Sequence, residues 1–494
     1  MRIREIKTGS GKRAIQVVSK RDGRLTVHKH IGTFASLEQK TKLYEQAQNY
    51  IQNISGQTNI FSLLNTINFS DIKITESKPL FTYQMLSEVY FKIGFNKFED
   101  PVLKDLIIAR VCYPTSKLET QEILAEFFGK NYGINTLYRH LKKAMFLGIQ
   151  ECFQAVLINF AKQEIRDSLK LVFYDVTTLY FESSIKTELK DFGFSKDHRT
   201  QDTQIVLGLV VTSQGFPLYF DIFNGKTFEG NTFIPVIEKI IALLNNPKLI
   251  VVADAAMISQ KNIDMLQAKN IGFIVGARVA NLPLKTINFI ADRILGDKEK
   301  VISLPYQKQK LICEYSSKRA NKDKSDRNKQ ISKALQLLAS PSTSLRRFRF
   351  IKIAGKNYQL NSNLIAKAEK LEGIKGYITN TDLPSNIVID RYKDLWKVEH
   401  SFRVTKSDLK ARPIFHRLDD AIKAHVIIVF AALAISRYIE IKTGLSIKKA
   451  LKISKKLLTH KVTNTKTGES NFMETSIEDK DILDQISLLK TLGH

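Results

Sequence analysis

The strongest constraint on the fold of this chain is a series of short apolar segments between residues 170 and 277. Their residue types and spacing predict three β-strands in succession, followed by an alternation of helix and strand. In chain order the predicted elements are strand Leu171 to Leu179, strand Gln204 to Thr212, strand Phe216 to Phe223, helix Thr232 to Leu244, strand Leu249 to Ala253, helix Gln260 to Lys269 and strand Phe273 to Ala277. Buried strands followed by helices indicate an α/β domain built on a mixed sheet.

Two of these strands carry an acidic residue at or near their exit. Asp175 interrupts the first apolar run, and Asp254 directly follows the fourth. This order of elements is that of a ribonuclease H-like core, in which the first and fourth strands lie side by side, so the two aspartates are expected to be neighbours. At a separation of about 4 to 5 Å their repulsion is roughly 3 to 4 kcal/mol at an effective dielectric near 20, and a bound metal ion would turn it into attraction. Either aspartate taken alone fits a helix cap or a turn equally well.

A third acid lies in a predicted amphipathic helix that ends before Pro413. Tyr392, Glu399 and Lys406 follow one another at intervals of seven residues, about two helical turns, so they are expected to line one face. On such a face the carboxylate can bind a cation while the phenol and the ammonium contact phosphate oxygens. The alternative is a solvated, charged helix whose apolar residues pack on the sheet. The single tryptophan, Trp396, is expected to be one of those core residues.

The composition favours a polyanionic partner. Lys and Arg number 76 against 49 Asp and Glu, which gives a net charge of +27 and a pI near 9.7. Such an excess attracts nucleic acids, although an organism with lysine-rich proteins would produce the same balance.

The three cysteines, Cys112, Cys152 and Cys313, lack the spacing of a disulfide framework or a zinc site and fit a reducing compartment. The first residues lack the apolar stretch of a signal peptide, and the apolar run Val426 to Ile435 is too short to span a bilayer, so we expect a buried helix there and no membrane role.

The N-terminal part is predicted to be basic and built from separate small modules. Alternating residues between Arg13 and Gly32 predict a β-hairpin with its turn at Asp22 and Gly23, followed by a polar helix from Ser36 to Ile54.

Further along, residues 119–145 resemble a helix-turn-helix, with helices at Glu119 to Phe128 and Asn135 to Met145 around a turn at Gly129 to Gly133. The second helix carries residues able to contact bases and phosphates, which are Thr136, Tyr138, Arg139, His140, Lys142 and Lys143. We take Arg139, Lys142 and Lys143 as candidate DNA contacts, with simple helix packing as the alternative.

Between the last predicted core strand and the helix of Glu399, residues 279–373 are predicted to form a basic, β-rich insertion. It contains a strand at Lys310 to Ser316, a basic helix from Lys318 to Leu338 and a strand pair within Arg346 to Leu360. The run Lys318 to Lys329 is either a contact for backbone phosphates or a solvated helix face. The predicted domains are 1–75 (hairpin and linker helix), 76–160 (helical, DNA-binding), 165–278 (core, first part), 279–373 (insertion), 374–440 (core, second part) and 441–494 (tail).

Several segments together resemble the DDE-type insertion-sequence transposases of the IS-four group. They are YDVTTLYFE around Asp175, ADAAM around Asp254, GYITNTDLP at 376–384, KARPIFHR at 410–417 and the apolar AHVIIVFAALAIS that follows, and the likeness spans roughly residues 165 to 440. The group has a Tyr, Arg, Glu, Lys signature spaced two, three and six residues apart. Tyr392, Glu399 and Lys406 match it, whereas Leu395 stands in the Arg position, and Arg403 or Lys393 is the candidate to replace that phosphate contact.

The resemblance implies a transposase with a ribonuclease H-like core that cleaves DNA at the ends of an element and joins it to target DNA by cut and paste. It implies that Asp175, Asp254 and Glu399 form the catalytic triad and bind two Mg²⁺ ions, with Mn²⁺ as a substitute. Tyr392, Arg403 and Lys406 would contact the DNA. The partners it implies are double-stranded DNA and a second copy of the chain in a synaptic complex, in the cytoplasm of a bacterium.

Two alternatives stay open at this point. One is a catalytically silent, domesticated DNA-binding protein, for which Leu395 in the Arg position is the argument. The other is a ribonuclease H-like nuclease without strand transfer.

Overall fold

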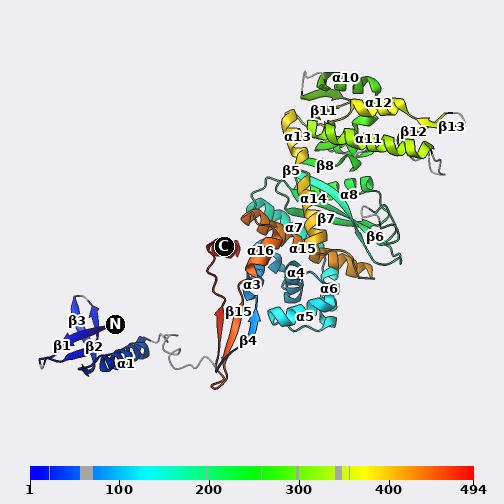
Figure 1. The fold of residues 1–494 in the computed structure, drawn as a ribbon. Coiled ribbons are helices and arrows are strands. Elements are labelled where there is room, and N and C mark those ends of the chain that lie inside the picture. Colours follow the sequence, from blue (N-terminus) through cyan, green and yellow to red (C-terminus); the bar gives the residue numbers. More distant parts are fainter. Residues whose placement is uncertain are drawn as a thin grey trace. The chain divides into compact units, whose positions relative to one another are not determined.

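The computed structural model describes residues 1–494 except 10, 22, 56–70, 196–198, 247, 258, 296–299, 340–347, 355–356 and 494. The chain divides into two compact units. Figure 1 shows the order of its helices and strands. One contains Met1–Lys78 and Thr459–Thr475, and the other contains Pro79–Leu458 and Ser476–His494. The smaller unit therefore combines segments from both ends of the chain.

An antiparallel sheet of order β1-β2-β3 begins the smaller unit, with strands β1 (Arg2–Lys7), β2 (Arg13–Arg21) and β3 (Arg24–Phe34). Helix α1 (Leu37–Ser55) packs on it around a small core of Ile15, Val17 and Ala47. The predicted hairpin is confirmed, with Gly23 at φ +80°, a conformation that glycine adopts without strain. Its other predicted turn residue, Asp22, lies outside the described residues. Strand β1 is an addition to the prediction.

The same unit holds a second antiparallel sheet of order β16-β15-β4, with β4 (Ile72–Lys78), β15 (Thr459–Asn464) and β16 (Ser470–Glu474). It joins segments almost 400 positions apart, for example Thr459 opposite Lys78. Sequence patterns did not predict these strands because most of their residues are polar and exposed, so the alternation of apolar and polar residues is weak.

The larger unit is built on an eight-stranded mixed sheet of order β10-β11-β14-β9-β8-β5-β6-β7. Its strands are β5 (Leu171–Tyr180), β6 (Gln204–Thr212), β7 (Pro217–Asn224), β8 (Ile250–Ala253), β9 (Gly272–Ala277), β10 (Val301–Tyr306), β11 (Gln309–Tyr315) and β14 (Ile374–Thr379). Strands β5, β8 and β9 are parallel and the other neighbours are antiparallel. With α8 (Glu229–Leu244) and α9 (Gln260–Ala268), every element predicted between residues 171 and 277 is present.

The predicted insertion is part of this sheet. Its hairpin β10-β11 pairs with β14, and β14 pairs with the core strand β9, with Gly376 opposite Ala277. The strand and the basic helix predicted in it are found as β11 and α11 (Ser317–Ala339). The predicted strand pair is shorter, β12 (Ile351–Ala354) and β13 (Asn357–Leu360), and the first predicted positions, 346–347, lie outside the described residues. The remaining helices here are α10 (Leu284–Leu295) and α12 (Ser362–Lys370).

The helical part of this unit is centred on helix α15 (Asp419–Thr443), which packs against α4, α6 and β7. The others are α3 (Leu80–Ile93), α4 (Pro101–Cys112), α5 (Lys117–Phe128), α6 (Ile134–Phe146), α7 (Ile149–Gln163), α16 (Ile447–Ser454) and α17 (Lys480–Lys490). By length and composition α15 could cross a membrane, yet 89% of its apolar window is buried inside the protein. The buried helix predicted around Val426 to Ile435 is therefore confirmed.

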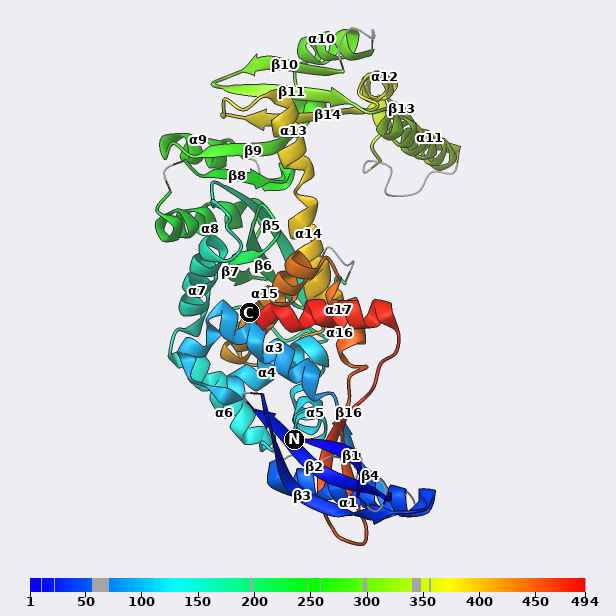
Figure 2. The same cartoon turned by 90° about the vertical axis from the view of Figure 1, so that its left-hand side faces the viewer.

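Helices α13 (Ser385–Lys393) and α14 (Trp396–Arg403) follow one another along the large sheet (Figure 2). Helix α13 packs on β8, β9 and β14, and α14 packs on β5 and β6. Short 3-10 helices lie at η2 (Phe95–Phe98), η3 (Ala255–Met257), η4 (Val279–Asn281) and η7 (Thr491–Gly493), and a π-helix, η6 (Val404–Asp408), follows α14.

Candidate active site

Asp175 and Asp254 occupy neighbouring positions on adjacent parallel strands. Tyr174 of β5 lies opposite Ala253, the last residue of β8. Asp175 follows Tyr174 within β5, and Asp254 directly follows the end of β8. Neighbouring strands are about 4.8 Å apart, so the two acids share one edge of the sheet, as predicted. Asp254 Oδ1 accepts a hydrogen bond from the backbone N–H of Ala255 at 2.7 Å, where η3 begins, and Asp175 Oδ1 accepts one from Val176 N–H at 2.7 Å.

Asp254 is held by Tyr392, a buried residue of α13. The Tyr392 hydroxyl donates a hydrogen bond to Asp254 Oδ1 at 3.0 Å. The ring lies directly over Gly276 of β9, where an added Cβ would come within 2.5 Å of the phenol oxygen. Glycine at 276 therefore makes room for this contact, and the phenol faces the carboxylate from inside the protein.

The environment of the phenol keeps it protonated. Burial, the charge of Asp254 and its hydrogen bond, and the charges of Asp175 and Glu399 all raise the pKa of Tyr392 above its usual value. Of the three acids, Asp254 is the one whose contact with the phenol is a hydrogen bond. Among the residues that the structure describes, however, no three His, Cys, Asp or Glu side chains are close enough together to hold a metal ion.

The third acid, Glu399, is exposed on α14, the helix that packs on the strand of Asp175. The helix turns its apolar face, with Val398 and Phe402, toward the sheet. Leu395, at the junction between α13 and α14, is buried in the same core. The sequence thus assigns the buried face of α14 to apolar residues and leaves Glu399 on the other side.

Tyr392, Glu399 and Lys406 do not line one regular helical face, so that prediction is wrong. Between α13 and α14 the backbone tightens, with Leu395 N–H bonded to the carbonyl of Tyr392 at 3.1 Å, three residues back. After α14 it widens into the π-helix η6, with Leu409 N–H bonded five residues back at 2.9 Å. Both changes rotate later side chains relative to a 3.6-residue repeat.

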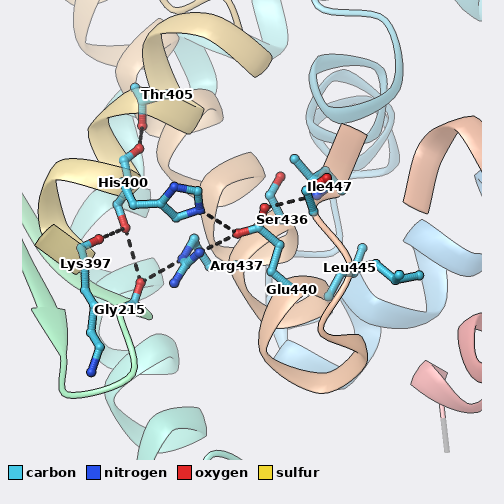
Figure 3. A network of polar contacts seen from close by, with 12 residues as sticks. Gly215, Lys397, His400, Thr405, Ser436, Arg437, Glu440, Leu445 and Ile447 are labelled. Carbon is cyan, nitrogen blue, oxygen red and sulfur yellow. Dashed lines mark hydrogen bonds and ion pairs between the residues drawn. The ribbon is translucent and has the colours of Figure 1, made fainter. Parts of the chain in front are cut away.

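A polar network fixes the side of α14 that faces α15 (Figure 3). Ser401 Oγ and Arg437 Nε both donate to the carbonyl of Gly215, at 3.2 and 3.1 Å. His400 Nε2 lies 3.2 Å from Glu440 Oε2, and Arg437 forms an ion pair with the same carboxylate. His400 therefore takes part in the packing of α14 against α15.

The backbone conformation of Gly215 and the charge of Glu440 both support this network. Gly215 has φ +81°, and a Cβ there would meet the Arg437 guanidinium at 2.6 Å. Burial tends to raise the pKa of Glu440, but hydrogen bonds from His400 and Ile447 N–H, together with the charge of Arg437, hold it below its usual value. A charged, fully bonded Glu440 therefore anchors α14 to α15.

Trp396 is exposed to 55%, so its predicted place in the core is wrong. Trp396 and Glu399 are three residues apart on α14 and share its outer face, while Val398 and Phe402 take the inner one. Lys375 of β14 was not predicted. Its ammonium lies 4.6 Å from the centroid of the Tyr392 ring. The pairing of β14 with β9 is what brings it there, and no local pattern around Lys375 signals that pairing.

The three basic candidates on α6, Arg139, Lys142 and Lys143, are all exposed. The opposite face of α6 packs against α4 and α15. His140, predicted to be available for DNA, instead bonds the carboxylate of Asp100 at 2.8 Å. The predicted pair of helices around a glycine turn is confirmed as α5 and α6.

The fold and the site together define a mixed α/β protein with paired acids at the edge of a large sheet. Residues 168–435 match the family described as "Transposase DDE domain". The match covers more than half of the chain, and the protein belongs to this family.

No curated protein matches the sequence. Among solved structures, the chain is similar to the piggyBac transposase in a cryo-EM structure of its synaptic complex with hairpin DNA. The TM-score is 0.41 and the identity 9%, with 77% of this chain and 79% of that chain covered.

Proposed function

We propose that the protein is the DNA transposase of an insertion sequence, which cleaves and joins element ends by cut-and-paste phosphoryl transfer. The observation that carries the proposal is the placement of Asp175 and Asp254 on adjacent parallel strands in a chain of the DDE transposase family. The order β7-β6-β5-β8-β9, in which β6 runs opposite to the other four strands, supports a ribonuclease H-like core. Glu399, on the helix that packs on β5, completes the proposed triad.

The proposed cofactor is a pair of Mg²⁺ ions, with Mn²⁺ as a substitute. The donor set fits, because Mg²⁺ prefers carboxylate oxygens and keeps water ligands that phosphate can replace. Asp175, Asp254 and Glu399 would hold the ions, and Glu399 is exposed on α14. Bound there, the ions would lower the pKa of the attacking water and stabilise the leaving 3′ oxygen. Tyr392 keeps Asp254 oriented by its hydrogen bond.

We propose that the chain uses the Tyr, Arg, Glu, Lys signature of the IS-four group with one substitution, Leu395 in the Arg position. Leu395 is buried and does not contact phosphate, and Lys393 forms an ion pair with Glu314 at 2.9 Å. Arg403, exposed one turn after Glu399, is the better candidate for the missing phosphate contact. Lys406, in the π-helix, is the proposed second contact.

Double-stranded DNA is the proposed partner, bound through the exposed basic residues of α6 and the excess of positive charge. Synapsis of two element ends makes a homodimer the proposed working unit, in the cytoplasm of a bacterium.

The test is a cleavage and joining assay on the inverted repeats that flank the gene, with Mg²⁺. Asp175→Asn, Asp254→Asn and Glu399→Gln should each abolish cleavage while binding of the repeats in a gel shift persists. Asp264→Asn, at an exposed acid on α9, is the matched control and should cleave normally. A variant of the triad that still cleaves removes its residue from the site. Binding without cleavage by the wild type would indicate a silent protein, and cleavage without joining a plain nuclease.

A further inference from the structure

A second, positively charged pocket lies between α4, α5 and the segment after η6. It has a volume of about 390 Å³, and its walls include Arg110, Lys117, Tyr138, Arg412, His416 and His425. None of these residues belongs to the acidic edge described above. The segments KARPIFHR and AHVII of the sequence meet here, since they contribute His416 and His425.

Two cations are buried in this pocket without an ion pair to an acid among the described residues. Arg110 and Lys117 are each only 5% exposed. Among the residues that the structure describes, neither forms an ion pair, and Arg110 Nε has no hydrogen-bond partner. Burial lowers the pKa of Arg110 to about 10, and burial together with the charge of Arg110 lowers that of Lys117. A buried charge without a partner is strongly unfavourable, so both groups favour the entry of an anion.

The acid closest to the pocket does not supply that anion. Glu119 lines the wall, but it is exposed and accepts a hydrogen bond from the Thr115 hydroxyl. Neither the pKa of Arg110 nor that of Lys117 is raised by it.

The two histidines leave the pocket positive. His425 Nε2 lies 3.1 Å from the carbonyl of Ala411 and donates to it, which leaves Nδ1 without a proton and without a partner among the described residues. The His416 ring lies 5.4 Å from that of His425. Burial and the charges of Lys117 and Arg110 lower the pKa of His416 to about 4. Both rings are therefore neutral near pH 7. His425 can only accept a further hydrogen bond, at Nδ1, whereas the neutral ring of His416 has one N–H to donate and one nitrogen to accept.

The rim adds features suited to a nucleic-acid strand. Residues 115–119, at the N-terminus of α5, line the pocket, and a helix N-terminus favours a phosphate. Tyr138 and Phe415 are exposed aromatic residues on the same lining, to which a base can stack. Lys410 and Arg412 stand on the other wall.

We propose that this pocket binds one phosphate group of a DNA strand, with Arg110 and Lys117 as its buried cations and with Tyr138 and Phe415 against the neighbouring bases. That the phosphate belongs to DNA rests on the proposed function. The pocket adjoins the end of β5, where Ile414 N–H bonds the carbonyl of Tyr180 at 3.2 Å. Tyr180 is five residues after Asp175, roughly 17 Å along the strand. At 3.4 Å per nucleotide that distance corresponds to about five nucleotides, so the bound phosphate should lie on the order of five nucleotides from the cleaved bond.

The first test measures melting temperature with the full chain and inorganic phosphate. Phosphate should raise the Tm of the wild type above its value in sodium chloride of equal ionic strength. Lys117→Met and, separately, Arg110→Gln should lose this phosphate-specific rise. Lys162→Met, at an exposed position of α7, is the matched control and should keep it. The comparison is made within each variant, so it holds whichever way the substitution itself changes stability.

A wild type without a phosphate-specific rise, or a Lys117→Met variant that keeps the full rise, overturns the proposal. The phosphate test requires no cleavage, so its result is independent of whether the protein cuts DNA.

The second test identifies the source of the phosphate. Single neutral methylphosphonate linkages are moved along the bound strand of an element-end duplex. In the wild type one linkage, about five nucleotides from the cleaved bond, should weaken binding about tenfold, the size of one charge-assisted hydrogen bond. Lys117→Met should bind that duplex and the unmodified one equally. A phosphate-dependent Tm without any such position would assign the pocket to a free phosphate compound and overturn the DNA part of the proposal.

Discussion

At the scale of single residues, the contact between Tyr392 and Asp254 shows how a buried side chain orients an exposed acid. The phenol donates at 3.0 Å, and Gly276 leaves room for it. Because its surroundings keep the phenol protonated, Tyr392 carries no negative charge with which to compete with the Asp254 carboxylate for a cation. It acts on Asp254 only as a hydrogen-bond donor. Tyr392 is therefore a positioning residue within the proposed site.

Tyr392→Phe removes this hydrogen bond and leaves the ring in place. The free energy of unfolding should fall by about 1 kcal/mol, the net contribution of one hydrogen bond. DNA cleavage should need a higher Mg²⁺ concentration for half-maximal rate, because Asp254 is no longer held. Urea unfolding and a Mg²⁺ titration of the cleavage rate measure the two effects. Tyr358→Phe, on β13, is the control, and an unchanged Mg²⁺ requirement in Tyr392→Phe would contradict a positioning role.

The histidines beside Arg110 and Lys117 make stability depend on pH. The pKa of His416 is about 4 in the folded chain, whereas an unfolded histidine titrates near 6.5. As the pH falls below about 6.5, the unfolded chain takes up a proton that the folded chain refuses until about pH 4. The free energy of unfolding therefore decreases through this window, by at most about 1.4 kcal/mol per pH unit for each such histidine. His425, whose pKa is also lowered, acts in the same direction.

Urea unfolding at about pH 7.5 and about pH 5 measures this loss. His416→Gln should reduce the difference between the two values. A variant with the same pH dependence as the wild type would show that His416 titrates normally in the folded chain.

At the scale of elements, the position of Glu399 depends on the polar network that joins α14 to α15. Arg437 and Glu440 are both nearly buried, and His400 shares the carboxylate. Removing one partner of a buried ion pair leaves the other charge uncompensated, which costs far more than removing both.

Arg437→Met should lower the free energy of unfolding by about 3 kcal/mol, because Glu440 stays buried with only His400 and one backbone N–H. In the double variant Arg437→Met with Glu440→Gln the loss should be smaller than the sum of the two single losses. Urea unfolding of the four proteins completes the cycle. Additive losses would show that the two side chains are not coupled.

The elements of the large sheet between residues 171 and 277 could be predicted from the sequence because their apolar runs are long and regular, whereas β10 and β14 of the same sheet were not predicted. The strand predicted at Gln204 to Thr212 agrees with β6 to the residue, and every position of β6 is buried. Periodicity and order also placed Asp175 beside Asp254, because the pairing of the first and fourth strands follows from topology. The strands β4 and β16 were missed because their side chains are mostly polar and exposed.

The orientation of the site residues could not be predicted in the same way. A pattern of seven-residue intervals assumes an unbroken α-helix, but the tight junction at Leu395 and the π-helix after Arg403 break it. Tyr392 therefore points into the protein while Glu399 and Trp396 stay outside. The buried pair Arg110 and Lys117 gave no signal either, because isolated basic residues on amphipathic helices are usually solvated.

At the scale of the whole molecule, the net charge of +27 is distributed over many elements, so it does not by itself locate the DNA. Two clusters of exposed basic residues are candidates for the DNA-binding surface. One is the exposed face of α6 with Arg139, Lys142 and Lys143, and the other is the basic part of α11, where Lys322, Lys324 and Lys329 are exposed. Salt dependence separates them, because each phosphate contact that is lost reduces the slope of log affinity against log salt by about 0.9.

If the chain neutralises roughly eight phosphates, the slope for the wild type is about −7. Substituting Gln at Arg139, Lys142 and Lys143 together should make the slope less negative by about 2.7 if α6 lies in a groove of the DNA, since all three phosphate contacts disappear. The matched triple, Gln at Lys322, Lys324 and Lys329, removes the same charge from α11. An unchanged slope in this second protein means that the α11 run is a solvated face, whereas an unchanged slope in the first removes α6 from the DNA interface. Fluorescence anisotropy of a labelled element end over a salt series measures both slopes.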